Sequence, residues 1–301
     1  PLPGAIEATV RNLREVAPTW YFNVPKGFEM LLPFLRSDAR LRKTFFSKLK
    51  VLWFAGAALP QHVFDDMKEL AFGTCGEEIA FLTGFGATET APATLGRVWP
   101  SANVANMGLP PAGVEVKLVP FQDSLEMRVK GPHVTPGYWR QPELSARAFD
   151  EEGWYRLGDA FVFEDPEKPG KGLLFAGRIA EDFKLSTGTW VHVGSLRASF
   201  IAHFAPLVRD VVIAGEGRNE VGALIFLSGK TTRQELQAKL NSLPSSGSSN
   251  RIARAIVLEE PPSLDAGEAT DKGSINQRAV LNRRKSLVDE LYSGSDRVLF
   301  A

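Results

Sequence analysis

The chain has 301 residues, with 35 basic against 35 acidic side chains and a hydrophobic share of 44%. This length allows two domains with cores of their own, and the balanced charge argues against nucleic acid or anionic membranes as partners. No apolar run approaches the ~20 residues that a membrane-spanning helix needs. The single cysteine, Cys75, excludes an internal disulfide and predicts a reducing, cytoplasmic setting. Metal-ligand spacing is missing from the four histidines, which are His62, His133, His192 and His203.

The first third of the chain alternates between helical and strand patterns. Amphipathic spacing predicts helices and aromatic or β-branched runs predict strands. The expected helices cover residues 6–16, 28–35, 41–49 and 62–71. The expected strands cover residues 19–24, 51–54 and 79–82. This alternation predicts an α/β layer up to about residue 107, with ligand chemistry at the carboxyl ends of the strands.

From about residue 108 the pattern changes to short strands separated by Gly, Pro and Asp turns. These strands are expected at residues 114–119, 125–130, 154–155, 160–163 and 173–176. Their spacing predicts a small β-barrel-like subdomain that ends at about residue 177.

The last part of the chain begins with a charged, glycine-containing connection at residues 177–188. A second alternating unit follows, which predicts a smaller α+β domain. Its expected helices cover residues 196–204, 232–240 and 278–291, and its expected strands cover residues 208–214, 222–226 and 254–258.

Residues 83–92, with the sequence TGFGATETAP, have the composition of a nucleotide site. Glycines on both sides of Phe85 let the backbone approach a flat ligand, on which the ring can stack. Thr88 offers a hydroxyl to a phosphate oxygen and Glu89 a carboxylate to Mg²⁺. The alternative is an ordinary strand-to-helix turn with Thr88 as its N-cap. A dinucleotide fingerprint is excluded because Glu89 stands where its last glycine would be.

Five separated blocks resemble, in order, the AMP-forming acyl-CoA synthetases of the adenylate-forming superfamily. The blocks cover residues 56–59, 85–89, 125–139, 155–159 and 177–188. The amino-acid sequences of residues 181–191 and 19–25 are most similar to those of feruloyl-CoA synthases. The resemblance implies that residues 1–177 are the carboxyl-terminal part of a large AMP-binding domain. Residues 178–301 would then be a small mobile domain that includes the hinge.

The resemblance implies a two-step ligase that uses ATP, Mg²⁺ and coenzyme A, in a pathway of aromatic acid catabolism. A hydroxycinnamate-type acid would attack the α-phosphorus of ATP and release pyrophosphate, and CoA would then displace AMP from the acyl-adenylate. The catalytic residues it implies are Thr88, Glu89, Lys184 and Lys272, with Glu89 as the metal ligand. The nucleotide-binding residues it implies are Gly84, Phe85, Gly86, Asp159 and Arg178, and the acyl pocket would contain Gly56, Ala57, Ala58, Trp20 and Tyr21.

Several of these residues also have structural explanations. Asp159 would accept both ribose hydroxyls, but an Asx turn at a strand end could also explain it. Arg178 could be a solvated charge of the hinge. Trp20 and Tyr21 belong to an aromatic run, for which core packing is the commoner explanation.

Three departures from the family pattern weaken parts of the assignment. The hinge position is Ala180, so Glu181 or Asp182 is a candidate to replace it. Ser274 stands where the adenylation lysine is expected, and Lys272 lies two residues earlier. The Ser/Thr/Gly-rich loop that cradles the β- and γ-phosphates is missing, which predicts that the chain is the carboxyl-terminal part of a longer enzyme.

Two alternatives to a CoA ligase remain. The acyl group could pass to the pantetheine of a carrier protein, although no carrier signature is present in the chain. The chain could also be a truncated fragment or a binding module without catalytic activity. The particular aryl acid and the oligomeric state are not predicted.

Overall fold

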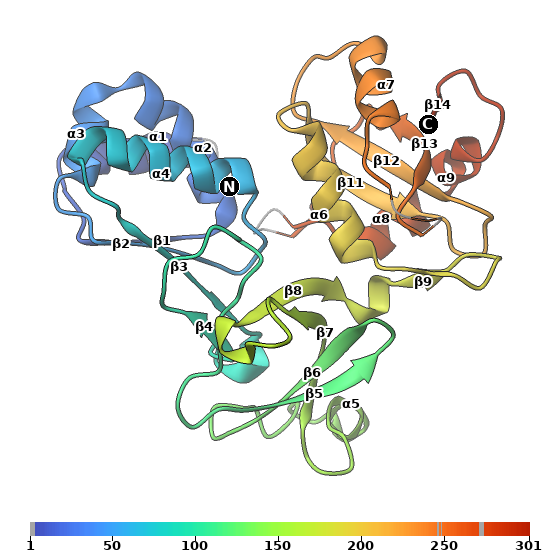
Figure 1. The fold of residues 1–301 in the computed structure, drawn as a ribbon, viewed down its shortest axis with the longest axis horizontal. Coiled ribbons are helices and arrows are strands. Elements are labelled where there is room, and N and C mark those ends of the chain that lie inside the picture. The colour runs from blue at the N-terminus through green and yellow to red at the C-terminus, as the bar shows by residue number, and fades with distance from the viewer. Residues whose placement is uncertain (1–3, 246, 248, 271–273) are drawn as a thin grey trace. The chain divides into compact units, whose positions relative to one another are not determined.

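A computed structural model describes residues 4–245, 247, 249–270 and 274–301. The chain divides into two compact units, Pro1–Ala176 and Gly177–Ala301, and we describe each by itself. Figure 1 labels their helices and strands. Among the described residues, no helix combines the length and apolar character that a membrane span requires.

The first unit begins with an α/β layer. Its helices are α1 (Ala5–Leu13), α2 (Pro25–Ser37), α3 (Ala39–Phe46) and α4 (Gln61–Cys75). Its strands are β1 (Trp20–Asn23), β2 (Val51–Ala55), β3 (Ala80–Phe85) and β4 (Leu95–Arg97), and they form a sheet in the order β1-β2-β3-β4. The first three strands run parallel and β4 is antiparallel to β3.

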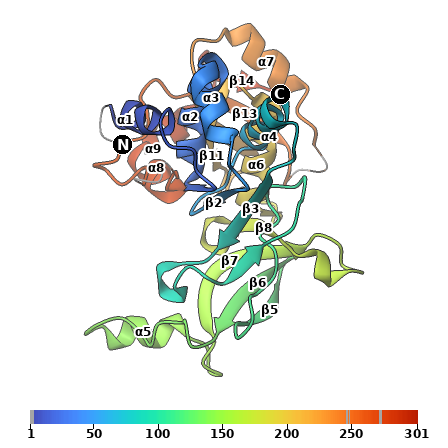
Figure 2. The same ribbon diagram turned by 90° about the vertical axis from the view of Figure 1, so that its left-hand side faces the viewer.

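All four helices lie on one face of this sheet (Figures 1 and 2). Strand residues of that face, such as Leu52, Phe54 and Phe81, are at most 3% exposed and belong to one core with the helices. The opposite face is less well covered, since Trp20 and Phe22 are 63% and 59% exposed. The α/β layer that the sequence predicts is present.

A second sheet completes the first unit. Its strands are β5 (Glu115–Phe121), β6 (Ser124–Lys130), β7 (Tyr155–Phe163) and β8 (Leu173–Arg178), and its exposed helix α5 (Pro142–Ala148) has no buried residue. The strand order is β5-β6-β7-β8, so β5 and β8 are edges. The prediction of a β-barrel-like subdomain is therefore wrong: this is an open four-stranded sheet.

The second unit contains a short hairpin, β9 (Phe183–Lys184) and β10 (Trp190–Val191), and a larger four-stranded sheet. The strands of that sheet are β11 (Val208–Ala214), β12 (Val221–Leu227), β13 (Ile252–Val257) and β14 (Leu299–Phe300), in this order. Its helices are α6 (Val193–Phe204), α7 (Arg233–Asn241), α8 (Gln277–Arg283) and α9 (Lys285–Leu291).

Side chains of the β11–β14 sheet alternate between two cores. Val211 and Ile213 pack with α6 and α7, whereas Val212 and Ala214 pack with α8 and α9. The sheet is thus covered by helices on both faces, which accounts for the predicted α+β composition of this part of the chain.

Candidate active site

The turn between β3 and β4 carries Thr88 and Glu89 at the carboxyl end of β3. A 3-10 turn spans Thr88–Thr90, and its N-cap position is Ala87. The capping hydroxyl comes from Thr90, which is fully buried and accepts a hydrogen bond from the amide of Ala87 at 3.0 Å. Thr88 is therefore not the N-cap, and its exposed side chain is left available to a ligand.

Gly86 is required by the close return of the chain in this turn. A Cβ atom at Gly86 would lie 2.5 Å from the carbonyl carbon of Pro92, far inside van der Waals contact. The amide of Thr94 closes the turn by donating to the carbonyl of Phe85 at 2.9 Å. The backbone that holds Glu89 is consequently well defined.

Two tyrosines, Tyr138 and Tyr155, form a chain of hydrogen bonds that connects Glu89 with the second sheet of the unit. The hydroxyl of Tyr138 donates to Oε1 of Glu89 at 2.8 Å and lies 3.2 Å from the hydroxyl of Tyr155. Since Tyr138 has one proton, which it donates to Glu89, the second contact requires Tyr155 to donate to Tyr138. The amide of Thr135 also donates to the carbonyl of Glu89 at 2.7 Å. The segment around residue 138 is thus attached to the turn by main chain and side chain.

The pKa shifts of Tyr138 and Tyr155 agree with a hydrogen bond that Tyr155 donates to Tyr138. Burial raises the pKa of Tyr155, and its bond to Tyr138 and the nearby charges of Glu89 and Asp159 raise it further. The bond from Tyr155 acts to lower the pKa of Tyr138, but burial and Glu89 outweigh it, so the pKa of Tyr138 is raised. Both phenols therefore stay protonated at neutral pH.

Asp159 lies inside β7, so the prediction that it ends a strand is wrong. Between the pairs Glu126–Ala160 and Arg128–Arg156, β7 takes four steps while β6 takes two, so β7 bulges by two residues. The bulge contains Gly158, whose φ of 74° is unfavourable for a side chain. Bulges redirect side chains next to functional sites, and Asp159 is 6% exposed in this one.

The ring of Phe85 packs with its neighbours rather than standing alone. It meets Phe161 edge-on at 5.1 Å between ring centroids and Phe175 in a tilted contact at 5.8 Å. Phe85 remains half-buried at the end of β3. Stacking of this ring on adenine stays a prediction, and core packing accounts for part of its surface.

Gly84, on the same strand, faces the ring of Trp53.

The predicted acyl-pocket residues fall at opposite ends of the parallel strands. Residues 56–58 follow the carboxyl end of β2 as an exposed loop, and Gly56 has a φ of 87°. Trp20 and Tyr21 begin β1, opposite the start of β2. The structure therefore does not bring Trp20 and Tyr21 together with residues 56–58.

Tyr21 occupies the helix-covered core of the first unit. Its ring makes edge contacts with Phe28 at 5.7 Å and Phe45 at 5.0 Å, and its hydroxyl accepts a hydrogen bond from Asn23. Burial raises the pKa of this phenol. The packing explanation accounts for Tyr21, whereas Trp20 lies on the other face and contacts Trp53 at 6.1 Å.

The remaining predicted site residues belong to the second unit. Arg178 is exposed at the end of β8, next to Gly177, where a Cβ atom would lie 2.7 Å from Cα of Gly194. Lys184 is exposed on the β9–β10 hairpin, with its Nζ 5.0 Å from the centre of the Trp190 ring. Lys272 lies outside the described residues.

Asp182 has a structural task in the hinge region. It accepts the amide of Val193 at 3.0 Å, where α6 begins, and its other oxygen lies 2.9 Å from Nδ1 of His192. Burial raises the pKa of neighbouring Glu181, although the charges of Arg197 and Arg178 oppose that effect. Asp182 is thus held by hydrogen bonds at the start of α6, and Glu181 lies between it and the exposed Ala180.

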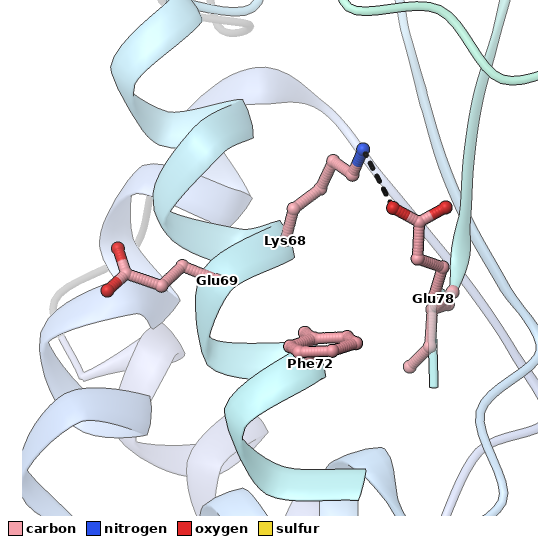
Figure 3. A pocket seen from close by; sticks show the side chains of 5 residues that line it. Lys68, Glu69, Phe72 and Glu78 are labelled. Carbon is pink, nitrogen blue, oxygen red and sulfur yellow. Dashed lines mark ion pairs between the residues drawn. The ribbon is translucent and has the colours of Figure 1, made fainter. Parts of the chain in front are cut away.

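A separate hollow of about 220 Å³ lies between α4 and the segment that leads into β3 (Figure 3). Its lining includes Lys68 and Glu78, whose charged atoms are 3.9 Å apart, and the half-exposed ring of Phe72. It is at the amino end of β3, so it is not part of the site at the carboxyl end.

Sequence reasoning assigned no role to Tyr138 or Tyr155, although both stand in the blocks that carry the family resemblance. Their side chains come together only through the pairing of β6 with β7 and the return of the chain past Glu89, over separations of 17 and 49 residues. No local sequence pattern predicts that these side chains are in contact.

Comparison with known proteins agrees with the resemblance in the sequence. A family model described as AMP-binding enzyme matches residues 2–139, and one described as AMP-binding enzyme C-terminal domain matches residues 183–296. A long-chain-fatty-acid–[acyl-carrier-protein] ligase of Arabidopsis thaliana, AEE15, is 24% identical over 79% of this chain and 35% of its own length. A feruloyl-CoA synthase of Amycolatopsis sp is 30% identical over 52% of this chain and 31% of its own length.

Matches that cover nearly the whole chain point the same way. An anthranilate–CoA ligase of Pseudomonas aeruginosa is 27% identical over 95% of this chain and 52% of its own length. The crystal structure of the anthranilate CoA ligase AuaEII with anthranoyl-AMP matches the fold with a TM-score of 0.73, at 21% identity, over 95% of this chain and 52% of that one. The chain thus spans about a third to a half of the length of these relatives. From both family models and these relatives, the chain belongs to the adenylate-forming superfamily of AMP-binding enzymes.

Proposed function

We propose that this chain takes part in the ATP-dependent activation of an aromatic carboxylic acid as its acyl-adenylate and in transfer of the acyl group to coenzyme A. The observation that carries the proposal is the chain of hydrogen bonds from Glu89 through Tyr138 to Tyr155, which connects Glu89 with β7, the strand that also carries the buried carboxylate of Asp159. A nucleotide needs one group for its metal ion and another for its ribose, and these two acids are suited to those tasks.

In the proposed site, Asp159 accepts hydrogen bonds from the ribose hydroxyls and Thr88 donates one to the α-phosphate. Phe85 presents its free surface to adenine beside the glycine backbone of the turn, Gly84 and Gly86. Arg178, Lys184 and Lys272 are the basic residues that the second unit would add.

The residues of the turn suit Mg²⁺, which proteins often bind through one or two carboxylates together with substrate phosphates and water. Within the described residues, no group of three or more His, Cys, Asp or Glu could hold a metal ion, so the protein would supply Glu89 and the nucleotide the remaining ligands. Oε1 of Glu89 is hydrogen-bonded to Tyr138, while Oε2 accepts no hydrogen bond from the part of the chain that the structure describes. When bound, Mg²⁺ would offset the charge that develops on the phosphates.

The proposed reaction has two steps. A carboxylate oxygen of the acid attacks the α-phosphorus, the bond to the bridging oxygen of pyrophosphate breaks, and an acyl-adenylate forms. The thiolate of CoA then attacks the acyl carbon, and AMP leaves with the electron pair of the broken C–O bond. Rotation of the second unit at the hinge would let one site serve both steps.

An aromatic acid is favoured by two of the relatives, a feruloyl-CoA synthase and an anthranilate–CoA ligase. The small residues 56–58 leave room for a flat ring beside the backbone. A hydroxycinnamate-type acid is our specific proposal within this class.

Transfer to a carrier protein is the second candidate. It is favoured by the relative that is named as an acyl-carrier-protein ligase. The two candidates share the adenylation step and differ in the thiol that accepts the acyl group.

The test is an assay of pyrophosphate release by the 301-residue chain with ATP, Mg²⁺ and a panel of acids: ferulate, coumarate, anthranilate and palmitate. We expect release with an aromatic acid, at a low rate because no phosphate-cradling loop was found in the sequence. Thioester formation is then measured with CoA and with an acyl carrier protein as competing acceptors. Release with palmitate alone, or an acyl group only on the carrier, would contradict the aryl-CoA proposal. No acid-dependent release, in a chain that still binds AMP, would favour a non-catalytic fragment.

A further inference from the structure

We infer that Tyr138 is a positioning residue that holds the Glu89 carboxylate in the orientation required for Mg²⁺–nucleotide binding, with Tyr155 fixing Tyr138 in turn. This inference rests on the proposed function of the Glu89 turn and assigns to two further residues a task in the same site.

The first step is the need for such a device. The backbone of the turn is held by Thr90 and by the close return at Gly86, but a glutamate side chain has three rotatable bonds of its own. Fixing a long side chain of this kind costs conformational entropy, which a partner must offset. A half-buried Glu89 without a partner would therefore sample several orientations.

The second step is the geometry of the partner. The hydroxyl of Tyr138 donates to Oε1 at 2.8 Å, which fixes one oxygen and leaves Oε2 to bind the metal ion. A phenol suits this task because it donates one directed hydrogen bond and adds no positive charge that would repel Mg²⁺. A lysine or arginine at this position would compete with the metal ion for the carboxylate.

The third step is the rigidity of Tyr138 itself. Its amide donates to Oγ of Ser145, in the middle of α5, at 2.8 Å, and the amide of Thr135 donates to the carbonyl of Glu89. Its hydroxyl lies 3.2 Å from that of Tyr155, a residue that is only 6% exposed. Tyr138 is therefore held at its backbone and at the far end of its ring.

The test measures the affinity of the chain for ATP in the presence of Mg²⁺ and in the presence of EDTA. In Tyr138→Phe we expect the gain in affinity from Mg²⁺ to shrink about three- to tenfold, which is the factor for one ordinary hydrogen bond. Affinity for AMP without Mg²⁺ should stay unchanged, because a positioning role acts only through Glu89. Tyr155→Phe, which keeps the bond to Glu89, should show a smaller loss.

A double-mutant cycle shows whether Tyr138 acts through Glu89. In a Glu89→Gln background, Tyr138→Phe should cause no further loss of the Mg²⁺ effect. An equal loss in both backgrounds, or equal weakening of AMP and Mg²⁺–ATP binding, would overturn the inference in favour of a general structural role. AMP binding that Asp159→Ala weakens, together with an unchanged Mg²⁺ effect in Tyr138→Phe, would overturn this inference alone.

Failure of the wild-type chain to bind any nucleotide would count against the proposed function. A second measurement then tests the interaction of Tyr138 with Glu89 without a nucleotide. Ionisation of Tyr138 is obtained from tyrosinate absorbance as the difference between chains with and without Tyr138→Phe. Because Glu89 disfavours the phenolate, Glu89→Gln should lower the pH of this ionisation. An unchanged ionisation would show that Tyr138 does not hold Glu89 and would overturn the inference.

Discussion

The acidic side chains that are partly or fully buried include Glu89, Asp159 and Glu268. They differ in the surroundings of their carboxylates. Glu89 is half-buried and accepts from a neutral phenol. Asp159 is 6% exposed in the bulge of β7. Glu268 is fully buried, and its two oxygens accept from Nε and Nη2 of Arg284, each at 2.8 Å. We propose ligand-binding roles for the first two, whereas both carboxylate oxygens of Glu268 are hydrogen-bonded to Arg284 inside the second unit.

Glu268 should stabilise the second unit in a pH-dependent manner. Its bonds to Arg284 are the main cause of a folded-state pKa lowered to about 2 from 4.5. A lowered pKa contributes stability that is present above pH 4.5 and is lost as the pH falls towards 2. We expect Glu268→Gln to reduce the free energy of unfolding at pH 7 by about 3 kcal/mol, since removal of one partner leaves a buried charge.

The measurement is chemical unfolding of wild type and Glu268→Gln between pH 7 and pH 2.5. The difference between the two proteins should narrow as the pH falls below 4.5. The matched control is Arg283→Ala, because Arg283 is about half exposed and lies 3.8 Å from Glu268. A constant difference at every pH would contradict the assigned role of the carboxylate.

At the scale of elements, the β3–β4 turn is sensitive to a single added methyl group. In Gly86→Ala the Cβ atom would meet main-chain atoms of Pro92 and Ala93, which cannot move aside as the end of a flexible side chain could. We expect a loss of about 1–3 kcal/mol in the stability of the first unit and weaker binding of AMP. Gly96→Ala is the matched control on the adjoining strand, where nothing lies within 4 Å of the added atom. Equal stability of the two variants, measured by thermal unfolding, would contradict this account of the turn.

Several elements show where local sequence patterns stop being informative. The sequence predicts two short strands at 154–155 and 160–163, but they are one strand, β7, because the bulge at Gly158 continues the pairing with β6. It predicts one helix at 278–291, but the helix is broken at Arg284, which turns inward to Glu268. The glycine and the periodic pattern are both visible in the sequence, but tertiary pairing decides which elements they form.

On the scale of the whole molecule, each unit has cores of its own. We therefore expect calorimetry to resolve two unfolding transitions. Glu268→Gln should lower the midpoint temperature of the transition of the second unit, and Gly86→Ala that of the first unit. AMP at 100 times its dissociation constant should stabilise the first unit by about 2.7 kcal/mol. A single transition that all three changes shift equally would contradict this division.

The candidate site was only partly predictable. A local run of ten residues marked Phe85, Thr88 and Glu89, because glycines, a hydroxyl and an acid occur side by side there. The contact of Tyr138 with Glu89 spans 49 residues and depends on a strand pairing that no periodicity records. The open form of the second sheet was missed for the same reason, since strand spacing alone does not say whether the outer strands meet.

The central claim is that the first unit binds a mononucleotide between the Glu89 turn and Asp159. Calorimetric titration of the chain with AMP tests it most directly, because AMP carries the ribose and the one phosphate that these residues would bind. We predict binding that weakens at least tenfold in Asp159→Ala and also in the closer-shaped Asp159→Asn. Asp165→Ala, which removes a carboxylate paired with Lys171, should leave the affinity unchanged. Failure of wild type to bind AMP, or equal affinity in wild type and both Asp159 variants, would contradict the account.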